Sequence, residues 1–242
     1  MRAVIMAAGV GSRISRQINN APKCTLDIGD ISIIENTITI LNKLGIQDIA
    51  IVLGYKAKYV MNILKNYNVN IFVNPFFKIT NSIASLWFAR EFIEGNDDLI
   101  LLNADVYFEE DLLKQVMNEK MNPVLFADKS RALCGDYKLK YENNILKKYG
   151  KELSKEDSTG EYIGIAKINR NFLNVFLEKL DYLIENQQFD LWWENILYSL
   201  VESNEIYVSD VEGKFWGEVD YLEDYIRILE YRNVKNKLLE IL

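Results

Sequence analysis

Buried-strand signals alternate with helical signals in the first half of this chain, and that alternation constrains the fold more than any other feature. Continuous apolar runs occupy residues 3–8, 48–53, 69–73 and 98–103, and helical periodicity occupies residues 33–44, 58–67 and 81–93. Strands that are apolar throughout are typical of parallel sheets covered by helices on both faces. We therefore expect an α/β fold with a Rossmann-like, mostly parallel central sheet flanked by helices.

The pattern changes after Pro123. Strand signals follow at residues 124–127, 137–141, 162–168 and 206–209, a polar stretch lies at 147–159, and helices are predicted at 171–186, at 190–202 and from 222 to the end. The chain shows no linker or internal repeat, and its 242 residues are enough for one sizeable core. We expect a single domain, 1–242, in which residues 124–220 form an inserted β/α region and 221–242 a C-terminal helix.

A glycine-rich loop follows the first apolar run. Its sequence is Gly9-Val10-Gly11-Ser12-Arg13, and Pro22-Lys23 follows about ten residues later. Glycines let backbone N–H groups turn toward a ligand, and stacked N–H groups at such a turn bind anions. The loop lacks the Gly-Lys-Ser/Thr ending of a P-loop and the third glycine of a dinucleotide-binding loop. The two glycines, the arginine and the lysine together predict a phosphate site; the alternative is a strand followed by an ordinary loop.

The composition excludes several kinds of chemistry. The chain has no histidine, which rules out Ser-His-Asp, Cys-His and His-ligated zinc sites. Its net charge of −7 and lack of a basic stripe argue against nucleic acid as a partner. Cys24 and Cys134 lie far apart and are expected to be reduced. No signal peptide or membrane-length apolar run is evident, so we expect a cytoplasmic protein that does not bind membranes.

Two aspartates follow apolar segments where a divalent cation site is expected. Asp105 ends the run Leu101-Leu-Asn103-Ala-Asp105, and Asp220 ends Trp216-Gly-Glu-Val-Asp220. In parallel sheets ligands bind beyond the carboxyl ends of the strands, and carboxylate oxygens there suit Mg²⁺. The alternative for each aspartate is a helix N-cap.

The loop up to Pro22-Lys23 resembles the signature loop of nucleotidyltransferases that join a nucleoside triphosphate to a phosphorylated small molecule. Over nearly its whole length the chain is similar to bacterial cytidylyltransferases of the phosphocholine cytidylyltransferase type, within the sugar-phosphate nucleotidyltransferase superfamily. The later matching pieces are Val52–Tyr55, Asn74-Pro75, Thr80–Leu86, Asn103–Asp105, Gly160–Lys167, Phe189–Glu194 and Trp216–Asp220. The resemblance implies the nucleotide-diphospho-sugar transferase type of fold, with a nucleotide-binding half at 1–123 and an acceptor-binding half at 124–220.

The resemblance also implies roles for individual residues. Arg13 and Lys23 would grip the triphosphate as the catalytic cations, and Asp105 and Asp220 would hold Mg²⁺. The nucleotide, CTP, would contact Ala8, Gly9, Gly11, Ser12, Tyr55, Asn81, Ser85 and Asn103. An acceptor phosphate is already ionised and needs no general base, so a site without histidine is consistent with the transfer.

The acceptor is predicted to carry an amine. Asp190 and Glu194 lie four residues apart on a predicted helix, hence on one face, and Trp193 lies between them in the sequence. Carboxylates and aromatic rings bind a cationic amine through ion pairs and cation–π contacts. With Glu161, these residues are the expected acceptor contacts; the alternative places Trp192 and Trp193 in the core and leaves the acids in solvent.

We therefore expect a Mg²⁺-dependent cytidylyltransferase that joins CTP to a small phosphorylated amine or alcohol for capsule or surface-polysaccharide modification. The acceptor class includes phosphocholine, phosphoethanolamine, aminoethylphosphonate and a phosphorylated amino acid such as glutamine phosphate. The rival hypotheses are a sugar-1-phosphate nucleotidyltransferase that uses another nucleotide and a catalytically silent nucleotide-binding domain. Leu238, Leu239, Ile241 and Leu242 at the end of the last helix leave open a homodimer or packing within the chain.

Overall fold

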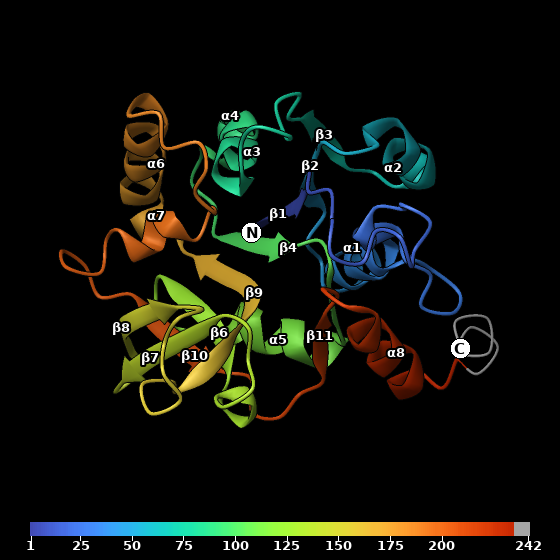
Figure 1. The fold of residues 1–242 in the computed structure, drawn as a ribbon. Coiled ribbons are helices and arrows are strands. Elements are labelled where there is room, and N and C mark those ends of the chain that lie inside the picture. Colours follow the sequence, from blue (N-terminus) through green and yellow to red (C-terminus); the bar gives the residue numbers. More distant parts are fainter. Residues whose placement is uncertain (235–242) are drawn as a thin grey trace.

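A computed structural model describes residues 1–234 of the chain. Its central feature is a nine-stranded sheet with the order β3-β2-β1-β4-β9-β6-β10-β8-β7 (Figure 1). The first four strands in this order are parallel: β3 (Asn70–Val73), β2 (Asp48–Leu53), β1 (Arg2–Ala7) and β4 (Leu99–Asn103). The parallel first half of the sheet is therefore confirmed.

The strands after Pro123 extend the same sheet. Strand β9 (Gly160–Ile168) runs antiparallel to both β4 and β6 (Val124–Asp128), and β10 (Tyr207–Asp210) runs parallel to β6. A hairpin of β7 (Lys138–Glu142) and β8 (Ile145–Gly150) completes the edge, and β7 also pairs with β9. The hairpin turn is Asn143-Asn144, and both residues have a positive φ, which asparagine tolerates better than most residues.

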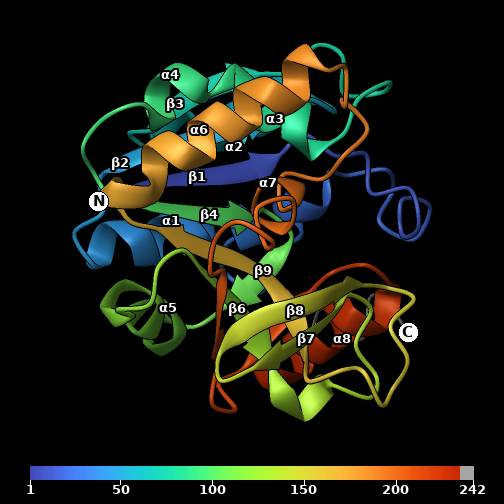
Figure 2. The same cartoon turned by 90° about the vertical axis from the view of Figure 1, so that its left-hand side faces the viewer.

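Helices cover both faces of the sheet, as the continuous apolar runs predict (Figure 2). On one face, Val4 and Met6 of β1 pack with α3 (Ser82–Phe88), α4 (Arg90–Ile93), α6 (Arg170–Glu185) and α7 (Asn195–Tyr198). On the other, Ala3 and Ile5 pack with α1 (Ile33–Lys43), α2 (Ala57–Ile63) and α5 (Glu110–Asn118). Because successive side chains of a strand point to opposite faces, a strand buried on both faces must be apolar throughout.

A third, smaller apolar cluster lies beside the main sheet. There α8 (Leu222–Tyr231) packs on a two-stranded sheet of β5 (Val106–Phe108) and β11 (Trp216–Glu218), and Ile14 and Ile28 from the long loop after β1 join it. Strands β5 and β11 bring Asp105 and Asp220 together, because Glu218 pairs with Val106 in their antiparallel register. This cluster therefore sets the position of both aspartates.

The loops that follow the first four strands meet at one edge of the sheet, as expected. The N–H of Tyr55 donates to the carbonyl of Ala8 at 3.0 Å, and the N–H of Ala104 donates to the carbonyl of Met6 at 3.1 Å. A Cβ at Gly54 would lie 2.7 Å from the carbonyl oxygen of Ala8, so only glycine allows this close approach. The loops after β1, β2 and β4 are thereby joined into one rim.

Several sequence predictions need correction. The helix predicted at 190–202 is only Asn195–Tyr198, with turns on either side. The polar stretch 147–159 begins within β8, and β5, β11 and α5 were not predicted from the sequence. The last helix is described over Leu222–Tyr231. The apolar residues proposed for a dimer contact, Leu238, Leu239, Ile241 and Leu242, lie outside the described residues.

Candidate active site

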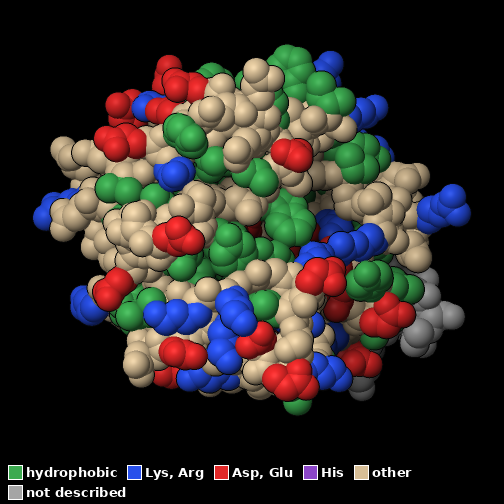
Figure 3. Space-filling model, turned by 60° about the vertical axis from the view of Figure 1, so that its left-hand side comes forward, with side chains coloured by type: hydrophobic (Ala, Val, Ile, Leu, Met, Phe, Trp, Pro, Cys, Tyr) green, Lys and Arg blue, Asp and Glu red, His purple; other side chains and the backbone are tan. Residues whose placement is uncertain are grey.

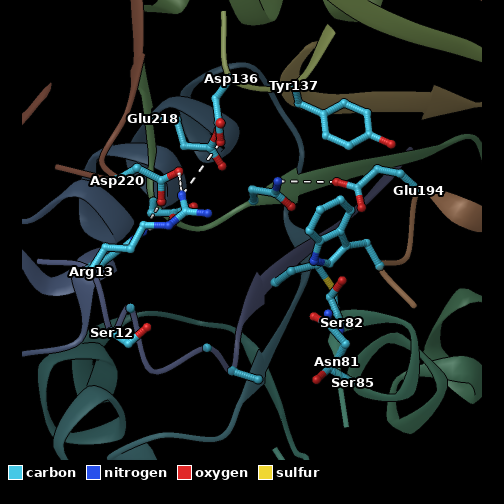
Figure 4. Close-up of a pocket in the computed structure, with 18 of the residues that line it drawn as sticks. Ser12, Arg13, Asn81, Ser82, Ser85, Asp136, Tyr137, Glu194, Glu218 and Asp220 are labelled. Carbon is cyan, nitrogen blue, oxygen red and sulfur yellow. Dashed lines mark hydrogen bonds and ion pairs between the residues drawn. The ribbon is translucent and has the colours of Figure 1, made fainter. Parts of the chain in front are cut away.

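A pocket of about 450 Å³ opens at the carboxyl edge of the parallel strands (Figure 3). The glycine loop and Lys23 form one side, the start of α3 forms a second, and residues from the β7–β9 region and α7 form a third. Figure 4 shows this arrangement, with Arg13 and Asp220 on one side, Asn81 and Ser85 on another, and Tyr137 and Glu194 opposite Arg13. The predicted residues that line the pocket are Ala8, Gly9, Gly11, Ser12, Arg13, Lys23, Asn81, Ser85, Asn103, Asp105, Glu194 and Asp220.

The two glycines of the loop serve different purposes. A Cβ at Gly11 would lie 2.8 Å from Cγ of Lys23, and Gly11 has a φ of +64°. Glycine at this position therefore gives the Lys23 side chain room to cross the loop. A Cβ at Gly9 would meet no atom within 4 Å, so Gly9 instead leaves the pocket open on the ligand side.

Lys23 lies between the two predicted metal ligands. Its Nζ is 2.5 Å from Oδ1 of Asp220 and 3.3 Å from Oδ2 of Asp105, and its side chain is 11% exposed. Burial acts to lower the pKa of Lys23, but the two carboxylates outweigh burial and raise the pKa above its usual value. Burial likewise acts to raise the pKa of Asp220, but Lys23 and Arg13 outweigh it, so the net shift is downward. Lys23 and Asp220 are therefore both ionised at neutral pH.

Arg13 extends this cluster across the pocket. One of its terminal nitrogens, Nη1, lies 2.5 Å from Oδ2 of Asp220 and 3.7 Å from Oδ2 of Asp136. Asp136 in turn pairs with Lys151, whose Nζ is 2.6 Å from the same oxygen. Asp220, Arg13, Asp136 and Lys151 thus form a line of alternating charges from the loop to the end of the β7–β8 hairpin, and Figure 4 shows Arg13 with Asp220 and Asp136.

Two oxygen ligands for a hard cation lie side by side in this cluster. The carboxylates of Asp105 and Asp220 both approach the Nζ of Lys23, and Asp220 also pairs with Arg13. Within residues 1–234 no group of three or more His, Cys, Asp or Glu side chains is arranged to hold a metal. Mg²⁺ is usually held by one or two carboxylates together with water and substrate phosphates, so this donor pair fits Mg²⁺ bound with a nucleotide.

Glu194, which is buried, and Glu218, which is partly buried, are two acids on the pocket wall. Burial raises the pKa of Glu194 to about 7, although a hydrogen bond from Asn103 acts in the opposite direction. Burial and the neighbouring charges of Asp105 and Asp220 hold the pKa of Glu218 well above its usual value. Acids with such raised pKa values in a pocket are typical of functional sites. A bound cation would favour their ionised forms.

Aromatic side chains surround these acids. The ring of Tyr137 stacks against Tyr198 at a centroid distance of 5.8 Å and meets Trp192 edge-on at 5.4 Å. Tyr162 completes the wall; its side chain is buried, and its hydroxyl has no hydrogen-bond partner within residues 1–234. The acids and rings form an enclosure suited to a small cation with a polar substituent.

The predicted base-recognition residues lie at the start of α3. The side-chain oxygen of Asn81 accepts from the N–H of Ser82 at 2.8 Å, and its Nδ2 donates to the carbonyl of Asp190 at 3.1 Å. The hydroxyl of Ser85 accepts from Nδ2 of Asn74 at 2.9 Å. These bonds fix the orientation of both side chains that face the pocket.

Four predicted contact residues do not line the pocket. The hydroxyl of Tyr55 instead donates to the carbonyl of Asn20 at 3.1 Å and so ties the glycine loop to the rim. Glu161 is buried against Arg131, and Asp190 contributes its backbone carbonyl to Asn81. Asp190 and Glu194 share no helical face, because the helix begins at Asn195.

Trp193 is also corrected, because its side chain is fully buried, whereas Trp192 lines the pocket and is 39% exposed. The segment between them is a turn, so adjacent side chains point to different sides. Of the two alternatives for these tryptophans, the core placement therefore holds for Trp193 and the pocket placement for Trp192.

The sequence analysis missed several lining residues. They are Met6, Phe77, Thr80, Ser82, Asp136, Tyr137, Lys151, Tyr162 and Tyr198. Tyr137 and Tyr162 flank the pairing of β7 with β9, in which Lys138 lies opposite Glu161. Only that long-range pairing brings them together, so no local pattern signals their role.

Comparison with known proteins agrees with this geometry. Residues 3–139 match the family model described as the MobA-like NTP transferase domain. The chain is 30% identical to the CTP:phosphoglutamine cytidylyltransferase of Campylobacter jejuni, over 93% of this chain and 97% of that protein. It is 23% identical to the choline-phosphate cytidylyltransferase of Streptococcus pneumoniae, over 98% of this chain and all of that protein.

The fold matches as well. A solved structure of the Streptococcus pneumoniae CTP:phosphocholine cytidylyltransferase superposes with a TM-score of 0.78 at 22% identity, covering 95% of this chain and 98% of that chain. The predicted resemblance and the predicted fold type are both confirmed.

Proposed function

Because this chain belongs to the family of MobA-like NTP transferase domains, we propose that it is a Mg²⁺-dependent cytidylyltransferase. Its substrates would be CTP and a small phosphorylated amine or amino acid, and its products a CDP-linked compound and pyrophosphate. The relatives at 30% and 23% identity, named as cytidylyltransferases for phosphoglutamine and choline phosphate, support this choice. We assign the product to modification of a surface polysaccharide.

The observation that carries the proposal is the cluster of Lys23 and Arg13 with Asp105 and Asp220 beside the glycine loop. The backbone of the loop and the two cations would bind the triphosphate. An oxygen of the acceptor phosphate attacks the α-phosphorus, forming a new P–O bond, while the bond from the α-phosphorus to the β-phosphate oxygen breaks and pyrophosphate leaves. Lys23 neutralises charge that builds up on the α-phosphate, which is the main demand of such transfers.

Asp105 and Asp220 would hold Mg²⁺, which when bound neutralises phosphate charge and orients the triphosphate. The Nζ of Lys23 contacts both carboxylates in this structure. Nucleotide binding would draw Lys23 toward phosphate oxygens and leave the carboxylates to the cation. The residues present therefore suit either partner.

The two remaining walls would receive the base and the acceptor. Asn81 and Ser85 carry oriented polar groups at the start of α3, and we assign them to the cytosine ring. Glu194 and Glu218 with the rings of Tyr137 and Trp192 would bind the acceptor amine. The hydroxyl of Tyr162, which has no hydrogen-bond partner among the described residues, is available to a polar group of the same acceptor.

Pyrophosphate release tests the proposal. The assay crosses CTP, UTP, dTTP, ATP and GTP, each with Mg²⁺, against phosphocholine, phosphoethanolamine, aminoethylphosphonate, phosphoglutamine and glucose 1-phosphate. We expect release only with CTP and an amino-bearing acceptor. Release only with a sugar 1-phosphate would overturn the acceptor assignment, and a purified, folded protein that releases none with any pair would support a silent binding domain.

A further inference from the structure

A hydrogen-bonded chain of three side chains runs from the core to the acceptor wall. The indole Nε1–H of Trp193 donates to Oδ1 of Asn103 at 2.9 Å, and Nδ2 of Asn103 donates to Oε1 of Glu194 at 3.4 Å. This series of hydrogen bonds begins at a fully buried tryptophan and ends at a carboxylate that lines the pocket.

The indole fixes which way the Asn103 amide faces. An indole N–H can only donate, so the amide oxygen must face Trp193 and the amide NH₂ must face Glu194. The reverse orientation would set two donors against each other and the amide oxygen against a carboxylate. Trp193 therefore determines that Glu194 receives a donor.

Two further contacts hold these hydrogen-bonded side chains in place. The backbone N–H of Trp193 donates to the hydroxyl of Ser82 at 2.9 Å, which anchors the turn to the start of α3. On the opposite side, a Cβ at Gly164 would lie 3.0 Å from Nδ2 of Asn103, and the φ of Gly164 is +75°. Glycine in strand β9 thus leaves the space that the amide occupies.

We propose that Trp193 is a positioning residue that acts through Asn103 to hold the Glu194 carboxylate where it binds the acceptor's amine. The proposal deepens the function proposed above and rests on its amino-bearing acceptor. It replaces the direct contact expected from the sequence with an indirect role. Trp193 touches no substrate; it sets the charge and orientation of the group that does.

The test compares Trp193→Phe, which keeps an aromatic ring but removes the N–H, with Trp87→Phe as a matched control. Trp87 is 41% exposed and does not line the pocket. In Trp193→Phe we expect the KM for an amino-bearing acceptor to rise roughly 3- to 10-fold, the range for one neutral hydrogen bond. The KM for CTP and the kcat/KM for 3,3-dimethylbutyl phosphate, whose alkyl group carries no positive charge, should stay within about twofold.

Asn103→Leu gives a second route to the same end and keeps the test informative if Trp193→Phe folds poorly. If both residues act through the same series of hydrogen bonds, the acceptor KM of the double variant should equal that of the single variants. It should not show the two fold-changes multiplied. Multiplied effects, or an unchanged acceptor KM in both single variants, would overturn the positioning role.

A readout that needs no turnover separates this proposal from the proposed function. The Glu194 carboxyl, observed by ¹³C NMR and identified with Glu194→Gln, should titrate at a higher pKa in Trp193→Phe because the Asn103 bond favours the ionised form. Among residues 1–234, the other ionisable groups that act on or face Glu194 are Asp105, Tyr137, Tyr162, Tyr198 and Glu218. An unchanged pKa would refute the proposal even if no amine were an acceptor, whereas failure of every amine in the wild type would refute only the acceptor assignment.

Discussion

Replacing Lys23 with alanine is the perturbation whose effects follow most directly from the site. Its Nζ balances two carboxylates at 2.5 and 3.3 Å, and both are only partly exposed. Removing one preorganised group that stabilises transition-state charge typically lowers kcat by about 10²- to 10³-fold, or about 3–4 kcal/mol. We expect a loss of that size, measured as pyrophosphate release at saturating substrates.

Stability should respond as well, and in a way that depends on metal. Lys23→Ala removes the cation that Asp105 and Asp220 share and leaves Asp220 paired with Arg13, at a cost of about 2 kcal/mol, which lowers Tm by roughly 4–8 °C for a chain of this size. Because Lys23 no longer competes for the carboxylates, Mg²⁺ should raise the Tm of the variant more than that of the wild type. Thermal unfolding with and without an excess of Mg²⁺, about 10 mM, measures both effects.

The matched control is Lys43→Ala. Lys43 also pairs with a carboxylate, but its side chain is 65% exposed and lies outside the pocket. Exposed pairs contribute little, so its kcat and Tm should stay near wild type. A Lys23→Ala protein with wild-type kcat, or with no larger response to Mg²⁺ than the wild type, would refute the reasoning about this cluster.

Three further predictions concern the rest of the pocket. Because burial raises the folded pKa of Glu194 to about 7 from its usual value of 4.5, its ionisation opposes folding as pH rises between these values. Glu194→Gln should therefore raise Tm relative to wild type at pH 8 but not at pH 4.5, and in the wild type the KM for an amino-bearing acceptor should fall as pH rises through about 7. Gly11→Ala should displace the Lys23 side chain and lower kcat at least tenfold in the pyrophosphate assay; wild-type turnover would contradict that clash. Tyr55→Phe, which removes the bond to the Asn20 carbonyl, should raise the KM for CTP by roughly 2- to 10-fold and leave the acceptor KM unchanged; an effect on the acceptor alone would contradict its placement.

The sequence was sufficient to predict the loop side of the site. The strand, the glycine loop and the Pro-Lys pair are local patterns, and the carboxyl-edge rule for parallel sheets places Asp105 on the same rim. Lys23 and Asp220 are 197 residues apart, yet each belongs to a recognisable local segment, so both could be assigned. Their ion pair depends on the pairing of β5 with β11, two short strands that the apolar pattern did not reveal.

The acceptor side could not be predicted in the same way. Helical spacing assigned Asp190 and Glu194 to one face, but the hydrogen bonds of residues 81–83 to the 189–191 segment hold that segment as a turn. Tertiary contacts override a short helical pattern when they satisfy the same backbone groups. Tyr137 comes from a hairpin whose position depends on its antiparallel pairing with β9, which has no local signature.

The central claim is that this site joins the phosphate of an amino-bearing acceptor to the α-phosphorus of CTP. The most direct measurement is ³¹P NMR of a reaction with CTP, Mg²⁺ and an acceptor, taken from the panel above, whose terminal phosphate oxygens carry ¹⁸O. The account predicts a new diphosphate with ¹⁸O in its bridge, together with an equal amount of unlabelled pyrophosphate. Conversion of CTP to CMP and pyrophosphate without the new diphosphate, or ¹⁸O in the pyrophosphate, would contradict it.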